Sequence, residues 1–341
     1  MHMADALISP AVGAAFWAAS AAGIAACSAK LRRELDDHKI PLMGVMGAFI
    51  FAAQMINFAI PATGSSGHIG GGLLLAVLLG PWAAFLTLAS VLMVQALFFA
   101  DGGLLALGCN IFNLGFFPAF IAYPLIYKPL ASKQPGQARL IFASIAAAVV
   151  GLQIGSFFVV TQTTLSGVAE LPFSTFLLMM QPIHLAIGVI EGIVTALVLS
   201  FVYKARPELL TASSAPQATA PMPKRTLLAI FLVASLMLGG LLSWFAAENP
   251  DGLEWAVAHV SGHEELENPE AQEHATAAAV QEKTALLPDY ALPATEGVAD
   301  DAQRQRVGTS LSGIVGGLVT LAFCLVIGLV LKKRGGKREQ A

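Results

Sequence analysis

The sequence predicts an all-α membrane protein with a seven-span core followed by two C-terminal spans. Hydrophobic residues make up 56% of the 341 residues and charged residues only 12%, whereas a soluble domain carries about 25% charged residues. The mean hydropathy is +0.71. Apolar stretches of about 18 or more residues recur along the chain, and this is the length that a helix needs to cross a bilayer.

Each span is predicted from an apolar run that ends at charged residues, glycine or proline. The first run is rich in alanine and ends before Lys30; no basic segment precedes it, so we do not interpret it as a cleavable signal peptide. The third run is short and is expected to break at Gly80-Pro81. The nine predicted spans lie at about residues 8–28, 41–60, 71–81, 82–100, 103–127, 140–160, 180–203, 226–246 and 309–331.

The basic residues predict which side of the membrane each loop faces, because cytoplasmic loops carry the excess of lysine and arginine. With the N-terminus outside and the C-terminus in the cytoplasm, sixteen of the nineteen basic residues fall in cytoplasmic segments. Only Lys283, Arg304 and Arg306 fall outside. We therefore expect a multi-pass protein of the cell inner (plasma) membrane in this orientation.

The composition divides the chain into two units. Residues 1–206, here called the core unit, hold seven spans joined by short loops, and residues 207–225 form a cytoplasmic linker rich in Ala, Pro, Ser and Thr. Residues 226–341, here called the accessory unit, hold two spans and an acidic outer loop at 247–308. Thirteen carboxylates lie in that loop against three basic residues. The loop is interpreted either as a solvated connection or as a weak electrostatic funnel for divalent cations.

The first two residues carry the most specific chemistry of the chain. The α-amine of Met1, the backbone amide of His2 and the His2 Nδ1 atom can reach one metal ion together, closing a five-membered and a six-membered chelate ring. An amide nitrogen gives up its proton only to a strongly Lewis-acidic ion that tolerates a planar nitrogen field. This favours Ni(II) or Cu(II) over Co(II). One further nitrogen would complete a square plane.

A second source of nitrogen follows the second predicted span. His68 lies between Gly67 and the run Gly70-Gly71-Gly72, in a loop that the predicted topology places on the same side as the N-terminus. Glycines on either side let the backbone approach another group closely. A histidine between glycines is often structural, but His68 is the only other histidine of the first seven spans in a predicted outer loop. We therefore interpret it as a ligand.

Several separated motifs connect these observations. They are Met1-His2, Gln54…Asn57-Phe58…Ser66-Gly67-His68, the segment 95–103, the segment 107–113, and His184-Leu185…Gly188…Ile190-Glu191-Gly192. Together they resemble the nickel/cobalt substrate-binding membrane components of energy-coupling-factor ABC transporters. The segment 250–255 (PDGLEW), directly after a span, is similar to the small accessory subunit of such systems. The family usually begins Met-His-Ile-Pro-Asp-Gly, whereas this chain continues Met3-Ala4-Asp5-Ala6 and lacks the proline and glycine of that turn.

The resemblance implies high-affinity uptake of Ni²⁺ or Co²⁺ as the transported substrate, with no catalytic cofactor and no nucleic-acid partner. The partners implied are a transmembrane coupling protein and ATP-binding cassette ATPases. The metal would be held by the Met1 amine, the amide and imidazole of His2 and the imidazole of His68. Three polar residues would orient the loop and the ligands, namely Asn57, Gln95 and Asp101. For Asp101, an ordinary charged residue at a helix end is the alternative. The planar amide-containing field favours nickel.

Two ionisable residues fall in the seventh predicted span, His184 near its outer end and Glu191 two turns deeper. An ionisable residue inside a span is a functional hypothesis by default. For Glu191 the alternative is a packing carboxylate paired with a neighbouring polar group. The cysteines are interpreted as small buried hydrophobic residues, and they are Cys27, Cys109 and Cys324.

The acidic loop contains a weaker alternative metal site. His259 and His263 are four residues apart, which would place both on one face of a helix, and His274 follows. Without a fixed scaffold this spacing is a weak signal, and a solvated acidic face is the competing interpretation.

The chain carries no phosphate-binding loop, since Gly335-Gly336-Lys337 lacks the residues that precede such a motif. It is therefore expected to be no enzyme and to need an ATPase partner. The first span carries small residues every four positions, which permit close helix packing in lipid, either against a partner or within its own bundle. One row is Ala11, Ala15, Ala19 and Gly23, and its neighbour is Ala14, Ala18, Ala22 and Ala26.

Two other function classes remain open. An ion-coupled secondary metal carrier would use Glu191 or Asp101 to relay protons and would work without an ATPase. A metal-binding membrane sensor or chaperone would bind without transport.

Overall fold

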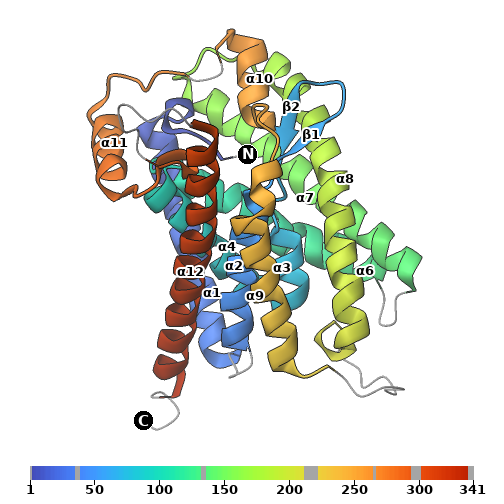
Figure 1. Ribbon diagram of the computed structural model, residues 1–341. Coiled ribbons are helices and arrows are strands. Elements are labelled where there is room, and N and C mark those ends of the chain that lie inside the picture. Colours follow the sequence, from blue (N-terminus) through green and yellow to red (C-terminus); the bar gives the residue numbers. More distant parts are fainter. Residues whose placement is uncertain are drawn as a thin grey trace.

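The computed structural model describes residues 2–34, 39–131, 136–210, 222–263, 266–292 and 301–336. Its long helices lie alongside one another, and the strands β1 and β2 and the helices α10 and α11 lie toward the end where the chain also begins (Figure 1). The elements of the core unit are η1 (Asp5–Leu7), α1 (Pro10–Glu34), α2 (Lys39–Gln54), β1 (Phe58–Ile60), β2 (Ser65–Gly67), α3 (Gly72–Leu79), α4 (Pro81–Phe99), α5 (Leu107–Ile111), the π-helix η2 (Phe112–Tyr127), α6 (Lys128–Ala131), α7 (Gln137–Ser166) and α8 (Phe173–Ala205). They are followed by η3 (Pro207–Leu209), α9 (Lys224–Gly240), η4 (Leu242–Phe245), α10 (Gly252–Ser261), α11 (Gln272–Thr284), η5 (Pro288–Tyr290) and α12 (Asp301–Gly336).

The all-α polytopic membrane fold is confirmed. Among the described residues, six helices are long and apolar enough to cross a membrane, at Pro10–Arg33, Pro81–Phe99, Leu107–Ala131, Gln137–Ser166, Phe173–Ala205 and Gln303–Lys333. The helices in the other three predicted spans are shorter: α2 has 16 residues, α3 has 8 and α9 has 17. The count of nine spans therefore stays a prediction.

The predicted break at Gly80-Pro81 is confirmed. Gly80 adopts φ 83° and ψ 159°, a combination that essentially only glycine tolerates, and α3 ends there. Pro81 then begins α4, because its fixed φ suits the first helical position and that position needs no N–H donor.

The second predicted span, 41–60, is wrong at its outer end. Helix α2 stops at Gln54, and the chain then forms a two-stranded antiparallel hairpin in which Phe58 pairs with Gly67 and Ile60 with Ser65. Pro61 disfavours the helical conformation at Ile60, so a helix could not have reached the end of the predicted span; the earlier stop at Gln54 is set by the hairpin. This hairpin places His68 directly after β2.

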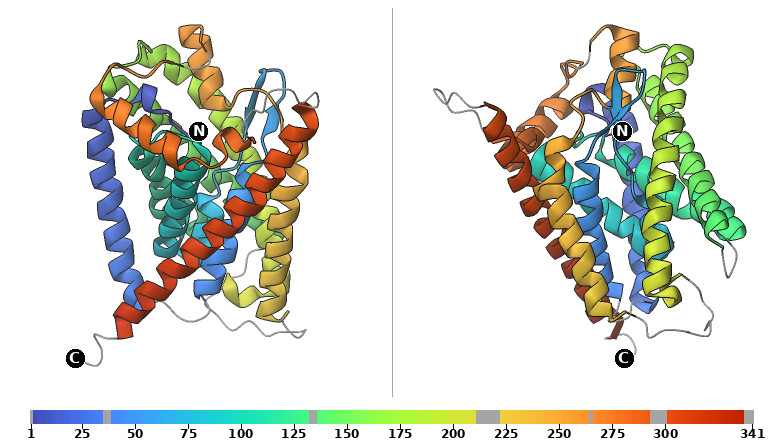
Figure 2. Two further views of the ribbon diagram at one scale, coloured as in Figure 1. Left: turned by 60° about the vertical axis from the view of Figure 1, so that its left-hand side comes forward. Right: turned by 45° about the vertical axis from the view of Figure 1, so that its right-hand side comes forward.

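The two long helices of the accessory unit pack against the core unit along α2. Gly239 of α9 meets Gly313 of α12 so closely that a methyl group on Gly313 would lie 2.2 Å from the Gly239 carbonyl oxygen. A methyl group on Gly47 of α2 would similarly lie 3.0 Å from the Cys324 Sγ atom of α12. Small residues at such crossings let helix backbones approach. In Figure 2, α12 crosses the bundle obliquely and ends far from the N-terminus.

The predicted linker lies largely outside the described residues, which stop at 210 and resume at 222. The described parts of the acidic loop contain the helices α10 and α11 and the turn η5, all at the end of the bundle where the N-terminus lies (Figures 1 and 2). The loop therefore contributes ordered structure beside the candidate ligands.

Candidate metal centre

The start of the chain is held in an extended conformation by backbone and amide contacts. Met3 is fully buried; its N–H donates to Asn110 Oδ1 at 2.8 Å, and its carbonyl accepts from Asn110 Nδ2 at 3.2 Å and from Gly103 N at 2.9 Å. These bonds fix the direction in which His2 enters the protein. The predicted ligand Met1 lies outside the described residues.

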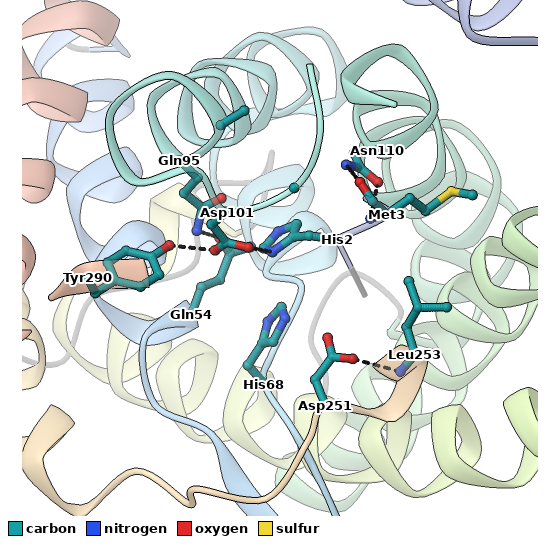
Figure 3. A network of polar contacts seen from close by, with 12 residues as sticks. His2, Met3, Gln54, His68, Gln95, Asp101, Asn110, Asp251, Leu253 and Tyr290 are labelled. Carbon is teal, nitrogen blue, oxygen red and sulfur yellow. Dashed lines mark hydrogen bonds and ion pairs between the residues drawn. The ribbon is translucent and has the colours of Figure 1, made fainter. Parts of the chain in front are cut away.

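His2 makes an ion pair with Asp101. The His2 Nδ1 atom lies 2.7 Å from Asp101 Oδ1, and the hydroxyl of Tyr290 donates to Asp101 Oδ2 at 2.5 Å (Figure 3). Burial alone would raise the pKa of Asp101, but His2 and the two hydrogen bonds outweigh burial and hold that pKa below its usual range. The His2 side chain is only 7% exposed, and its Nε2 atom is buried with no hydrogen-bond partner among the described residues.

His68 lies beside His2. Their rings stack with centroids 5.1 Å apart and planes inclined by 24°. The Ile69 carbonyl can only accept a hydrogen bond, so His68 Nδ1 carries the proton that it donates over 3.1 Å, and Nε2 is the ring nitrogen with the lone pair. Burial lowers the pKa of His68 to about 3, so the ring is neutral at physiological pH.

The glycine-rich loop after His68 is tied to the spans. Both oxygens of Glu191 accept backbone N–H groups, from Gly70 at 2.7 Å and from Gly71 at 3.1 Å. The Gly70 carbonyl in turn accepts from Gln54 Nε2 at 2.8 Å. Glu191 of α8 is thus paired with polar neighbours, as the alternative interpretation of this residue expects. Its two hydrogen bonds anchor the loop to α8.

The three residues expected to orient the ligands differ in their contacts. Asp101 contacts His2 directly. Gln95 donates to Gln54 Oε1 at 2.8 Å, so it acts on the His68 loop through Gln54. Asn57 lines the pocket, and its carbonyl accepts from Ala247 N at 2.8 Å.

A polar pocket of about 770 Å³ is lined in part by the two histidines, His2 and His68. It is formed by both units, and its lining includes His2, His68, Asp101, Glu248, Asp251, Glu254, Tyr290 and Arg306. Carboxylates outnumber basic side chains in this lining, which suits a cation. A second, much smaller cavity of about 10 Å³ lies next to it and is lined by His68, His184 and Asp251, among others.

His184 lies on α8 at the edge of this small cavity and is 1% exposed. Its Nδ1 atom donates to the Met180 carbonyl at 2.8 Å, which leaves the lone pair on Nε2. That Nε2 atom is buried and has no hydrogen-bond partner among the described residues.

The histidines of the acidic loop do not form the alternative site. Helix α10 ends at Ser261, and Gly262 has φ 82°, so His263 lies beyond the helix that carries His259. Both side chains are exposed, and His259 stacks on Trp255 with centroids 4.0 Å apart. His274 is buried elsewhere, where its Nε2 donates to the carbonyls of Asp5 and Ile8.

Three residues of the site were assigned no role from the sequence. They are Asn110, Tyr290 and Asp251. The one available signal was for Asp251, because D-x-x-E at a helix start is a capping box, and the structure contains that box with Glu254. Burial alone would raise the pKa of Asp251, but nearby positive charge and the hydrogen bond from the Glu254 N–H hold that pKa below its usual range.

The described side chains do not form a complete metal site by themselves. Among the described residues, no group of three or more His, Cys, Asp or Glu side chains is arranged to hold a metal ion. A metal site built on His2 and His68 therefore also needs backbone donor atoms. In addition, His2 Nδ1 would have to leave Asp101, which it contacts in this structure, before it could bind a metal ion.

Comparisons with known proteins find matches over nearly the whole chain. Residues 2–209 match the family described as the cobalt uptake substrate-specific transmembrane region, and residues 225–333 match the PDGLE domain. The chain is 31% identical to a putative fused nickel transport protein of Archaeoglobus fulgidus over 95% of this chain and 96% of the relative. It is 30% identical to a fused nickel transport protein of Rhodobacter capsulatus, over 98% and 100% of the two chains. The crystal structure of a truncated transition metal transporter matches with a TM-score of 0.53 and 29% identity, covering 60% of this chain and 99% of that one.

Proposed function

Because the chain belongs to the family of the cobalt uptake substrate-specific transmembrane region, joined here to a PDGLE domain, we propose that it takes up Ni²⁺ or Co²⁺. It acts as the substrate-binding component of an ATP-driven transporter. Its ligands are the Met1 amine, the His2 amide and imidazole, and the His68 imidazole. The observation that carries this proposal is the pair of stacked imidazoles, 5.1 Å apart, beneath an acidic pocket.

Metal binding exchanges one partner of His2 for another. The chelate needs the Nδ1 atom of His2, and in this structure that atom lies 2.7 Å from the Asp101 carboxylate. The incoming cation must displace that contact, while the hydroxyl of Tyr290 retains Asp101 at the edge of the site. Asp101 therefore orients the His2 ring at the pocket wall.

Nickel is the favoured cargo on the chemistry of the donors. A deprotonated amide and a planar set of nitrogens suit Ni(II) better than Co(II). The names of the relatives support both ions: fused nickel transport proteins match over nearly the whole chain, and cobalt transport proteins match over a smaller part, as in the 32% identity over 62% of this chain to a protein of Sorangium cellulosum.

The contacts of Glu191 favour an ATP-driven system over an ion-coupled carrier. Both of its oxygens accept backbone N–H groups of the His68 loop, so it serves as an anchor. A proton relay would have to break these bonds in each cycle. The deciding experiment is uptake of trace ⁶³Ni²⁺ and ⁵⁷Co²⁺ in cells without other importers, with the coupling protein and ATPases present, absent or carrying an inactive ATPase. Uptake that continues with an inactive ATPase would refute the ATP-driven mechanism, and binding without uptake in every strain would indicate a sensor.

The coupling protein is expected to dock on α1. The alanines of both small-residue rows are exposed, so they do not pack within this chain's own bundle. Replacing Ala15 or Ala19 with Leu would hold a partner helix away by the thickness of a side chain. We expect metal binding to survive while co-purification with the coupling protein and uptake are lost. Normal transport by both variants would place the docking surface on another helix.

A further inference from the structure

The accessory unit attaches directly to the hairpin that carries His68. Ser66 of β2 forms a parallel bridge with Asp251, donating its N–H to the Pro250 carbonyl at 2.8 Å and its hydroxyl to the Asn249 carbonyl at 2.7 Å. The Trp255 indole donates to the Thr63 carbonyl at 2.9 Å. The segment 249–251 is therefore joined to β2 by a single bridge at Ser66, two residues before His68.

This attachment fixes the position of Asp251 in the pocket. Its Oδ1 atom accepts the N–H groups of Leu253 at 2.7 Å and Glu254 at 2.9 Å, so the carboxylate also caps α10. Figure 3 shows the carboxylate pointing toward the space that His2 and His68 border. Asp251 lines both the large pocket and the small cavity beside His68.

The small cavity supplies an independent indication of a polar ligand beside Asp251. The Nε2 atom of His184 is buried and has no partner among the described residues. A methyl group on Gly252, the residue after Asp251, would lie 3.4 Å from the adjacent His184 Cε1 atom. A buried acceptor with no partner is costly unless water or an ion reaches it.

The charge of the proposed site requires a further anion. A divalent cation held by one deprotonated amide and three neutral nitrogens keeps a net charge of about +1, and burying such a charge without compensation is unfavourable. Asp101 is held by the Tyr290 hydroxyl and lines the large pocket but not the small cavity. Asp251 is the carboxylate that borders both cavities and is held by the hairpin of His68.

We propose that Asp251 of the accessory unit supplies an oxygen ligand to the cation that the core unit holds through nitrogen. This inference rests on the proposed function and deepens it, because it makes the accessory unit part of the substrate site. An added oxygen converts a four-coordinate planar field into a five-coordinate one. Such a field is acceptable to Co(II) as well as to Ni(II), so Asp251 would broaden the range of ions accepted.

The test uses the full chain, purified with Ni²⁺ as the probe and examined by X-ray absorption and calorimetry. Wild type is expected to show five-coordinate Ni(II). Asp251→Ser keeps a capping hydroxyl but cannot reach the metal; it should show the pre-edge feature of planar four-coordinate Ni(II) and bind about tenfold or more weakly. Glu248→Ser is the matched control, because it removes another carboxylate of the same pocket and should change neither property.

Each outcome is decisive. An unchanged spectrum and affinity in Asp251→Ser would overturn the role of Asp251. Equal losses in Asp251→Ser and Glu248→Ser would also overturn it, since they would show a general effect of pocket charge. If Asp251→Ser fails to fold, Asp251→Asn keeps both shape and cap and should still lose affinity; unchanged affinity there counts against the proposal. A wild-type chain that binds no Ni²⁺, or His68→Ala binding as wild type does, would refute the proposed site itself.

Discussion

The candidate histidines of the core unit differ in burial from the pair His259 and His263 of the accessory unit. In the core unit, the side chains of His2, His68 and His184 are buried and line two neighbouring cavities, and His2 and His184 each keep one ring nitrogen without a partner among the described residues. In the accessory unit, His259 and His263 are exposed, although their spacing is the more familiar one for a metal site. The comparison teaches that spacing along a helix is insufficient to indicate a metal site, because it does not report whether the side chains line a pocket.

The largest effect is expected from a single Gly inserted before His2. The insertion separates the α-amine from the His2 amide and changes the size of the chelate rings. Tight binding should fall by more than about a thousandfold, because two donors are lost and each ligand contributes strongly to a chelate. The measurement is metal retained per purified chain after gel filtration. Retention equal to that of wild type would exclude the N-terminal chelate.

The next effect separates the two groups of histidines. His68→Ala should lower metal affinity by about a hundredfold, since one of four proposed nitrogen donors is lost. Its loop stays anchored through Glu191, so yield and thermal stability should change little.

His259→Ala is the matched control, because it removes an exposed imidazole from the same end of the bundle. It should bind metal as wild type does. A reversed result, with His259→Ala losing metal and His68→Ala keeping it, would assign binding to the acidic loop.

The third effect is a dependence of affinity on pH. A free α-amine titrates near pH 8 and a free histidine near 6.5, and an amide donor also releases its proton. Burial lowers the pKa of His68 to about 3, so this ring is already unprotonated between pH 6 and 8 and adds nothing to the slope. Affinity should therefore fall by more than about tenfold per unit as pH drops through this window.

Calorimetry in buffers of different ionisation enthalpy counts the protons released on binding. We expect more than one per metal at pH 7. A count near zero would be incompatible with an amide donor.

The smallest effect is expected from His274→Ala. His274 Nε2 donates to the carbonyls of Asp5 and Ile8, which follow the proposed ligands along the chain. Losing this shared hydrogen bond should cost about 1 kcal/mol of stability and reduce metal affinity only a few-fold. Thermal unfolding and metal titration of the same sample measure both quantities. A loss as large as that of His68→Ala would add His274 to the essential residues.

Much of the fold could be predicted from local features. Apolar length indicates the long helices, and Gly80-Pro81 marks a break because only glycine readily adopts its φ and ψ. The hairpin at residues 58–67 could not be found in this way, since the apolar run hides the effect of Pro61. The π-helix over Phe112–Tyr127 was not predicted, although Pro118 and Pro124 lie within it.

The predicted candidates around the site had local signals, whereas of the accessory contributions only Asp251 had one, the capping box of α10. His2 and His68 are marked by the chain start and by flanking glycines. Tyr290 meets Asp101 across 189 residues of sequence, and its placement depends on the packing of its ring against Phe99, with centroids 5.0 Å apart. Such long-range contacts arise from tertiary packing. No spacing in a single sequence reports them.

The pocket walls come from chain positions as far apart as His2 and Thr309, and this has a consequence for biosynthesis. A ribosome adds about 5–20 residues per second, so Tyr290 and its turn emerge roughly ten to forty seconds after His68. During that interval the nascent chain lacks Tyr290 and Thr309, which form part of the pocket lining. A polypeptide that ended within that interval would keep His2 and His68 but would lack this part of the wall.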